Sequence, residues 1–96
     1  MIDLSGQVAL VTGGSRGLGL QMARALGGQG ARVILSARKV HELEAATAEL
    51  SALGIDASWL VADVSREDDI TALTAASLQR ADGRIDILVN NAGNSW

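Results

Sequence analysis

The sequence has 96 residues, enough for one small domain, and it contains no cysteine, which excludes disulfide bonds and thiolate metal sites. Its net charge of −3 argues against nucleic acid as a partner, and no apolar segment approaches the roughly 20 residues of a membrane span. No secretory signal peptide is evident at the start, so the composition predicts a cytoplasmic protein.

The apolar residues are almost all aliphatic, because the chain has two tryptophans and neither phenylalanine nor tyrosine. Such a composition suits helices packed on a parallel sheet, whose buried strands consist of Val, Ile and Leu. The charges are unevenly distributed. Residues 1–39 carry five basic side chains and one acidic side chain, whereas residues 40–96 carry three basic and ten acidic ones.

The first part of the chain predicts two strands, each followed by a helix. An aliphatic strand at 8–11 leads into a glycine-rich segment at 12–19. Apolar residues at i, i+4 and i+8 then predict a helix over 18–26 that stops at the glycines after it. A second strand is predicted at 32–36, and apolar residues at three- and four-residue steps predict a second helix over 40–50.

The second part of the chain continues this alternation. Gly54 follows the second helix at a position where a left-handed C-cap is usual. A third strand is predicted at 59–62. Ser65 then offers an N-cap for a third helix, which continues towards Gly83. The last predicted element is a fourth strand at 85–89.

Strands that alternate with helices at this pitch imply parallel pairing with right-handed crossovers. We therefore expect an α/β fold with a Rossmann-like, doubly wound parallel sheet. Its first four strands would have the order 3-2-1-4, with helices on both faces. In such sheets the ligand binds outside the carboxyl ends of the strands. The segments that follow the four strands lie at 12–19, 36–39, 63–65 and 90–94.

Residues 12–19, TGGSRGLG, form a glycine loop between a predicted strand and a predicted helix, a context typical of phosphate binding. The spacing matches neither a Walker loop nor G-x-G-x-x-G. Gly13 would permit a sharp turn. Gly17 and Gly19 would let the backbone approach a pyrophosphate and let the helix start close to the sheet. Gly14 is then an additional glycine, and an ordinary strand-to-helix turn is the alternative interpretation.

Three segments together resemble one protein family. The pattern T-G-x-x-x-G-x-G at 12–19 is similar to the cofactor loop of the classical short-chain dehydrogenases/reductases, and N-N-A-G at 90–93 is similar to a second motif of that family. Asp63 and Val64 match the acidic and apolar pair after its third strand. The chain resembles the N-terminal, cofactor-binding half of such an enzyme, so we expect residues 1–96 to be part of a longer single-domain reductase.

The resemblance implies an NAD(P)(H) site built from the ends of the strands. The residues that it assigns to the cofactor are Gly13, Ser15, Arg16, Gly17, Leu18, Gly19, Asp63, Val64, Asn90, Ala92 and Gly93. Asn91 would tie the fourth strand to the glycine loop. Two alternatives stay open, because Asp63 could be a helix-capping or surface acid and Asn91 could be purely structural.

The turn after the second strand indicates which dinucleotide to expect. NAD-binding enzymes of this architecture place Asp or Glu about 20 residues past the glycines, where it binds the ribose 2′-hydroxyl. The sequence has Ser-Ala-Arg at 36–38 instead, with no carboxylate to repel a 2′-phosphate. Arg38, with Arg16 across the glycine loop, could hold that phosphate through charge-assisted hydrogen bonds. We therefore expect NADP(H) to be favoured over NAD(H), unless the arginines only stack on the adenine or face solvent.

The catalytic groups that the resemblance implies are absent from the chain. The family uses a tyrosine in a Y-x-x-x-K motif, assisted by a serine, whereas this chain has no tyrosine and its one lysine is Lys39. We expect residues 1–96 alone to be inactive. The longer protein would be an oxidoreductase for a small carbonyl compound or secondary alcohol, such as a sugar acid or a 3-oxoacyl compound, and a homo-oligomer (tetramer or dimer). A non-catalytic NAD(P)-binding module is the alternative.

No metal site is expected from the sequence. His41 is the only histidine, and one histidine without cysteine cannot make a usual zinc site. The acids at 67–69 are adjacent along the chain, so they are better explained as a cluster at the N-terminus of a helix.

Overall fold

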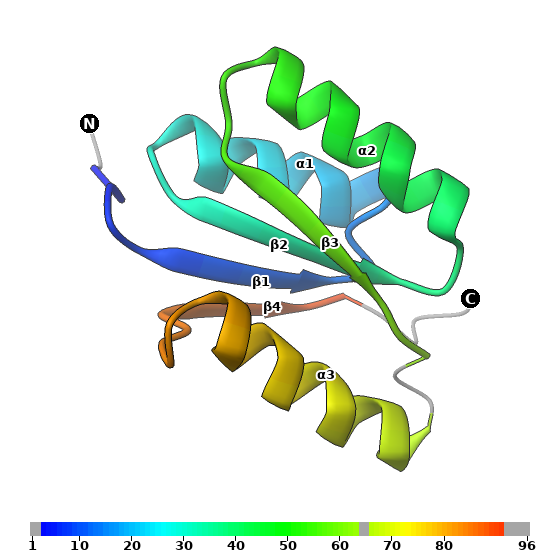
Figure 1. The fold of residues 1–96 in the computed structure, drawn as a ribbon. Helices are drawn as coiled ribbons and strands as arrows, with labels where there is room; N and C mark the ends of the chain where they lie inside the picture. The colour runs from blue at the N-terminus through cyan, green and yellow to red at the C-terminus, as the bar shows by residue number, and fades with distance from the viewer. Residues whose placement is uncertain (1–2, 64–65, 92–96) are drawn as a thin grey trace.

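The computed structural model describes residues 3–63 and 66–91, and it contains one parallel sheet with helices on both faces (Figure 1). The elements are β1 (Val8–Thr12), α1 (Gly17–Gly28), β2 (Arg32–Ala37), α2 (Val40–Ala52), β3 (Ala57–Val61), α3 (Glu67–Arg80) and β4 (Ile87–Asn90). The strand order is β3-β2-β1-β4, and every pairing is parallel. The predicted α/β fold, with strand order 3-2-1-4, is confirmed.

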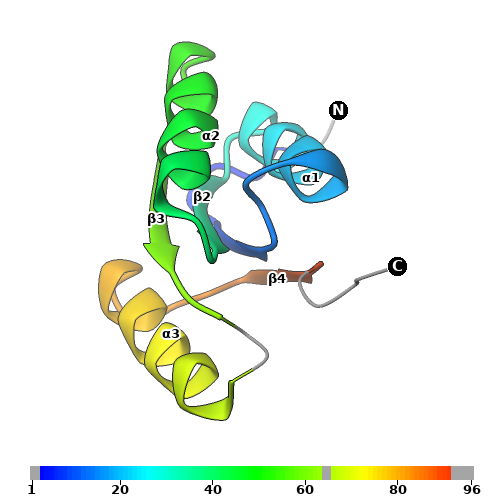
Figure 2. The ribbon, with the colours of Figure 1, turned by 90° about the vertical axis from the view of Figure 1, so that its right-hand side faces the viewer.

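The two faces of the sheet are covered by different helices. Helices α1 and α2 lie over one face and α3 over the other (Figure 2). Successive residues of a strand point to opposite faces, so Val33 and Leu35 of β2 pack under α1 and α2 while Ile34 faces α3. The core on the first face consists of Val11, Ala23, Val33, Leu35, Leu43, Ala46, Leu50 and Ile55.

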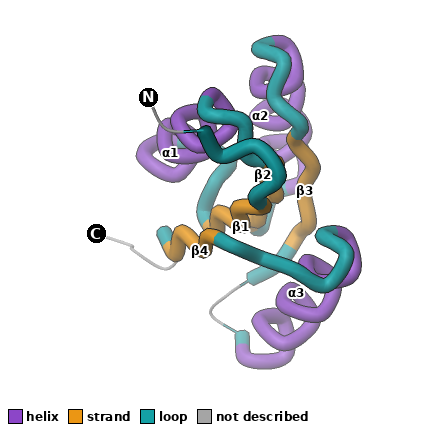
Figure 3. The backbone as a smooth tube through the Cα atoms, turned by 90° about the vertical axis from the view of Figure 1, so that its left-hand side faces the viewer, coloured by secondary structure: helices purple, strands orange, loops and turns teal. Residues whose placement is uncertain are grey.

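The face under α3 has the thinner core. Its buried cluster consists of Val8, Leu10, Ile34, Ala62, Leu73 and Ala81. Helix α3 contributes one large apolar side chain to it, Leu73, and presents the small and fully buried Ser77 beside it. In the end-on view, α3 lies on the opposite side of the strands from α1 and α2 (Figure 3). Leu88 of β4 pairs in register with Leu10, yet it is 64% exposed, so α3 does not cover the sheet as far as β4.

Some element boundaries differ from the sequence-based prediction. Strand β3 begins at Ala57 instead of at 59, and β4 begins at Ile87 instead of at 85. The prediction that Ser65 is the N-cap of α3 is wrong, because that position is held by Arg66, which has extended backbone angles and makes no side-chain capping bond. Three acidic residues in the first turn of α3 stabilise its N-terminus instead, through their interaction with the helix dipole. Gly54 adopts the predicted left-handed conformation, with φ of 81°.

The exposed edge of β4 generates the first prediction. Strand β4 pairs only with β1 among the described strands, so its other side offers unpaired backbone groups beside the exposed Leu88. We expect the 96-residue chain to self-associate at high concentration, and Leu88→Lys to shift it towards monomer in sedimentation velocity. Leu53→Lys is the matched control, because Leu53 is 58% exposed but follows α2, away from this edge. A monomeric wild-type chain that melts cooperatively above about 65 °C, the upper end for ordinary mesophile domains, would contradict this account.

Candidate functional site

The carboxyl ends of the strands meet at one end of the sheet, where the glycine loop is bonded to its neighbours. The N–H groups of Gly13 and Gly14 donate to the carbonyl oxygen of Ser36, at 2.7 and 3.3 Å. On the other side, the N–H of Asn91 donates to the carbonyl oxygen of Thr12 at 3.2 Å. The structure therefore places the beginning of the loop between the ends of β2 and β4.

The Thr12 hydroxyl strengthens the connection to β4. Its oxygen lies 3.1 Å from Oδ1 of Asn90 and 3.3 Å from the carbonyl oxygen of Val89, and it accepts a bond from the Asn91 N–H at 3.2 Å. Thr12 is buried, so these bonds are shielded from water. The motif contained Thr12, but sequence reasoning gave it no role. The Asn91 N–H joins β4 to the loop through the backbone, and the expected role of the Asn91 side chain stays a prediction.

The glycines of the loop serve different purposes. A side chain at Gly19 would collide with the Gly13 carbonyl group and would approach Nδ2 of Asn91 to 3.1 Å. Gly19 therefore lets α1 start directly against the end of β1. Gly17, with φ of 59°, has no atom within 4 Å of its Cβ position, so the space above it is open to a ligand.

Gly14 has a packing role, so the interpretation that it is merely an additional glycine of the loop is wrong. A Cβ atom there would lie 2.9 Å from Cδ2 of Leu35 and 3.0 Å from the Val11 carbonyl oxygen. The sequence could not reveal this contact, because Leu35 belongs to a different strand.

The N-terminus of α1 is prepared for an anion. Arg16 occupies the N-cap and makes no side-chain capping bond, and the first turn contains no acidic residue. Within residues 3–63 and 66–91, no hydrogen bond engages the N–H groups of Gly17, Leu18 and Gly19. Free N–H groups and the positive end of the helix dipole attract negative charge. A pyrophosphate fits this arrangement, whereas the acidic first turn of α3 would repel one.

The basic side chains divide into engaged and free ones. Five are engaged, and their partners are Glu49 for Arg24, Asp56 for Arg32, Glu42 for Lys39, Asp86 for Arg84 and the Trp59 carbonyl oxygen for Arg80. In the part of the chain that the structure describes, Arg16, Arg38 and Arg66 have no ion pair or side-chain hydrogen bond. Arg16 and Arg38 are exposed and follow β1 and β2, respectively, at the carboxyl end of the sheet.

The remaining predicted residues are only partly described. Asp63 lies where predicted, just past β3, and its N–H donates to Oδ2 of Asp69 at 2.9 Å. Its carbonyl oxygen accepts a bond from the Arg66 N–H at 3.0 Å, so its backbone joins β3 to α3. Val64, Ala92 and Gly93, which the resemblance assigns to the cofactor, lie outside the described residues.

Sequence reasoning missed Glu42. The Ser15 hydroxyl donates to Oε1 of Glu42 at 3.3 Å, across 27 positions of the chain. Oε2 of the same carboxylate lies 3.7 Å from Nζ of Lys39. Its position in the first turn of α2 is visible in the sequence, but its contact with the glycine loop depends on how α2 packs beside α1.

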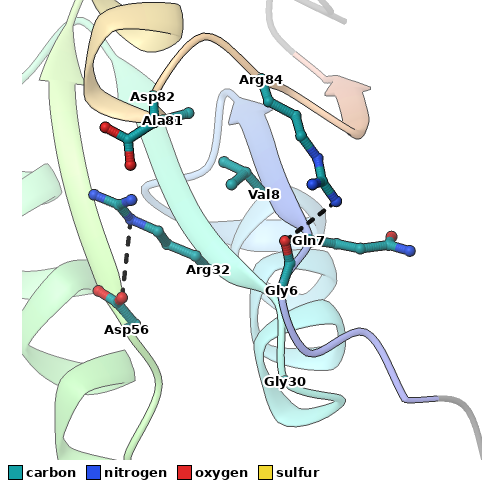
Figure 4. Close-up of a pocket in the computed structure, with 9 residues that line it drawn as sticks. All are labelled: Gly6, Gln7, Val8, Gly30, Arg32, Asp56, Ala81, Asp82 and Arg84. Carbon is teal, nitrogen blue, oxygen red and sulfur yellow. Dashed lines mark hydrogen bonds and ion pairs between the residues drawn. The ribbon is translucent and has the colours of Figure 1, made fainter.

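A surface pocket of about 470 Å³ lies at the opposite, amino end of the sheet (Figure 4). Both arginines that line it are already paired, since Arg32 lies 3.8 Å from Asp56 and Arg84 lies 2.8 Å from Asp86, and Asp82 adds a further acidic group to the lining. Hydrogen bonds from Arg84 and from the Val8 N–H hold the pKa of Asp86 below its ordinary value. None of the predicted cofactor residues lines this pocket, so it is not the site that the sequence indicates.

Residues 3–63 and 66–91 contain no group of three or more His, Cys, Asp and Glu side chains that could hold a metal ion. No helix in this part of the chain is both long enough and apolar enough to cross a membrane.

Comparison with known proteins agrees with this geometry. A family model described as short chain dehydrogenase matches residues 7–96. The chain belongs to the short-chain dehydrogenase family. It is 45% identical over 93 residues to gluconate 5-dehydrogenase of Gluconobacter oxydans, and 46% identical over 94 residues to the rhamnolipid-biosynthesis 3-oxoacyl-[acyl-carrier-protein] reductase of Pseudomonas aeruginosa. These matches cover 97% and 98% of this chain, but 36% of each relative.

A solved structure adds a cofactor to the comparison. A metagenomic short-chain oxidoreductase in complex with NADP is 50% identical and superposes with a TM-score of 0.90. The match covers 97% of this chain and 42% of that protein. The family and the fold of the chain are therefore established, and its relatives include an NADP-bound oxidoreductase.

The packing of Gly19 generates the second prediction. Gly19→Ala places a methyl group against the Gly13 carbonyl, so we expect it to lower the free energy of unfolding by about 1–3 kcal/mol, as overpacking typically does. Gly28→Ala is the matched control, since Gly28 belongs to the same helix and has no atom within 4 Å of its Cβ position. We expect the control to be neutral or slightly stabilising. Equal effects of the two substitutions in urea unfolding would contradict the packing role of Gly19.

Proposed function

We propose that this chain is the cofactor-binding part of an NADP(H)-dependent oxidoreductase that interconverts a carbonyl group and a secondary alcohol. One observation carries the proposal: the free N–H groups at the start of α1 lie at the carboxyl end of the sheet, next to Arg16, which has no partner among the described residues. This combination suits the phosphates of a dinucleotide. The NADP-bound relative supports the same assignment.

The glycine loop would hold the pyrophosphate at the α1 N-terminus, where the space above Gly17 is open. Leu18 would contribute its backbone there, with Ser15 and Arg16 beside the adenosine ribose. Asp63 and Asn90 would contact the adenine and its ribose from the ends of β3 and β4. When bound, NADP(H) supplies or accepts the hydride, and the described residues of this chain bind and orient it.

The preference for NADP(H) over NAD(H) is proposed on the charge of the turn after β2. Residues 36–39 contain Arg38 and Lys39 and no acid. Arg38 makes no ion pair within the described residues, so its guanidinium is available to a 2′-phosphate without first losing a protein partner. A planar guanidinium binds phosphate oxygens in a bidentate manner, which a lysine cannot do.

The third prediction tests this preference. Arg38→Asp removes a charge-assisted contact, which is worth roughly 1.5–3 kcal/mol and corresponds to about a ten- to hundredfold weaker Kd for NADPH. The Kd for NADH should change much less. Arg24→Asp makes the same change of charge on α1, where Arg24 pairs with Glu49, and serves as the control. Fluorescence titration of both reduced cofactors measures the effect, and a Kd ratio that Arg38→Asp leaves unchanged would refute the role of Arg38.

The catalytic step is proposed to use groups outside these 96 residues, because the chain spans 36% of its curated relatives and has no tyrosine. The relatives favour a sugar acid or a 3-oxoacyl compound as the substrate of the longer protein. We further propose that this longer protein is cytoplasmic and forms a homo-oligomer.

A non-catalytic NAD(P)-binding module is the second candidate, and the absence of Y-x-x-x-K from these 96 residues favours it if the chain acts alone.

The fourth prediction separates cofactor binding from turnover. Residues 1–96 should bind NADPH but should not oxidise it in the presence of a carbonyl substrate, because the chain lacks the family's general acid. The assay follows the absorbance of NADPH with ketogluconate or a 3-oxoacyl thioester. Substrate-dependent oxidation by the purified 96-residue chain would show that its catalytic groups lie within it.

A further inference from the structure

Glu42 links the two segments that surround the proposed 2′-phosphate position. Its Oε1 accepts the Ser15 hydroxyl at 3.3 Å, and Ser15 belongs to the glycine loop. Its Oε2 lies 3.7 Å from Nζ of Lys39, the residue that precedes α2. Among the described residues, Glu42 provides the only carboxylate that is hydrogen-bonded to the glycine loop.

This carboxylate changes the charge that a ligand meets. Arg38 and Lys39 are adjacent, but in the described part of the chain only Lys39 is paired, and its partner is Glu42. The Glu42 side chain is 25% exposed, so its charge is less screened by water than that of a fully exposed acid. Glu42 thus occupies the Ser15 hydroxyl and offsets the charge of Lys39, the residue next to Arg38.

We propose that Glu42 is a specificity-determining residue that restrains the preference for NADP(H), a role that rests on the proposed function of this site. A 2′-phosphate carries up to two negative charges near neutral pH, and a nearby carboxylate repels it. The ribose 2′-hydroxyl of NAD(H) is neutral and meets no such repulsion. Glu42 acts through its charge and through Ser15 and Lys39, and it therefore sets the balance between the two cofactors without a direct contact to either.

A purely structural role of Glu42 is the competing explanation. An acid in the first turn of α2 stabilises the helix, and its bond to Ser15 helps to hold the loop. Glu42→Gln separates the two roles, because glutamine keeps an oxygen that can accept the Ser15 hydroxyl but removes the charge. A structural role predicts a change in stability with equal effects on both cofactors, whereas the proposed role predicts a change in their ratio.

The test is a titration of the full chain with NADPH and with NADH. Glu42→Gln should tighten NADPH binding roughly three- to tenfold at low ionic strength, as expected for removal of one partly screened charge, and the gain should shrink in 1 M salt. NADH binding should change less than about twofold. Glu49→Gln is the matched control, because Glu49 is on the same helix and also loses an ion pair, at 3.1 Å from Arg24.

A second variant tests the route through Lys39. Lys39→Gln should weaken NADPH binding in the wild-type chain, because it leaves the Glu42 carboxylate without its cation, and it should remove much of the gain when combined with Glu42→Gln. An NADPH-to-NADH ratio that Glu42→Gln leaves unchanged, or that Glu49→Gln shifts equally, would overturn the role of Glu42 alone. A wild-type chain that is folded by circular dichroism and binds neither cofactor would overturn the proposed function together with it.

Discussion

The close approach of α1 to the end of β1 is the constraint on which the rest of the site depends. A side chain at Gly19 would collide with the Gly13 carbonyl group, so the helix can begin there only because that side chain is missing. Gly13 is in turn fixed by its bond to Ser36, and Thr12 is fixed by its bonds to the end of β4. The α1 N-terminus is therefore held by the backbone at the carboxyl end of three neighbouring strands. Its free N–H groups lie together at that end of the sheet.

The distribution of paired charge separates the two ends of the sheet. At the amino end, Arg32 and Arg84 are both paired with aspartates, so neither cation that lines the pocket there is free. At the carboxyl end, Arg16 and Arg38 have no protein partner within the described residues. The pocket of about 470 Å³ and the proposed cofactor site are thus at opposite ends of the sheet. An anionic cofactor is drawn to the end where positive charge and helix dipole act together.

The sequence was sufficient where local pattern determines structure. Aliphatic runs and three- to four-residue spacing located every strand and helix, and parallel pairing followed from their alternation. The sequence-based prediction failed where the conformation or the contacts of a residue depend on a segment that is distant in the sequence. Ala57 and Ser58 have little intrinsic preference for a strand, but they pair with Val33 and Ile34 of β2. The tight packing of Gly14 against Leu35, and the bond between Ser15 and Glu42, likewise required knowledge of the tertiary structure.

The central claim is that a dinucleotide binds at the carboxyl end of the sheet, and backbone amide NMR of the labelled chain during titration with NADP⁺ tests it most directly. The account predicts that the largest chemical-shift changes fall on the amides of residues 13–19, 38 and 90–91. Changes concentrated instead on Gly6, Gln7, Gly30 and Arg84, which line the pocket at the amino end, would contradict it.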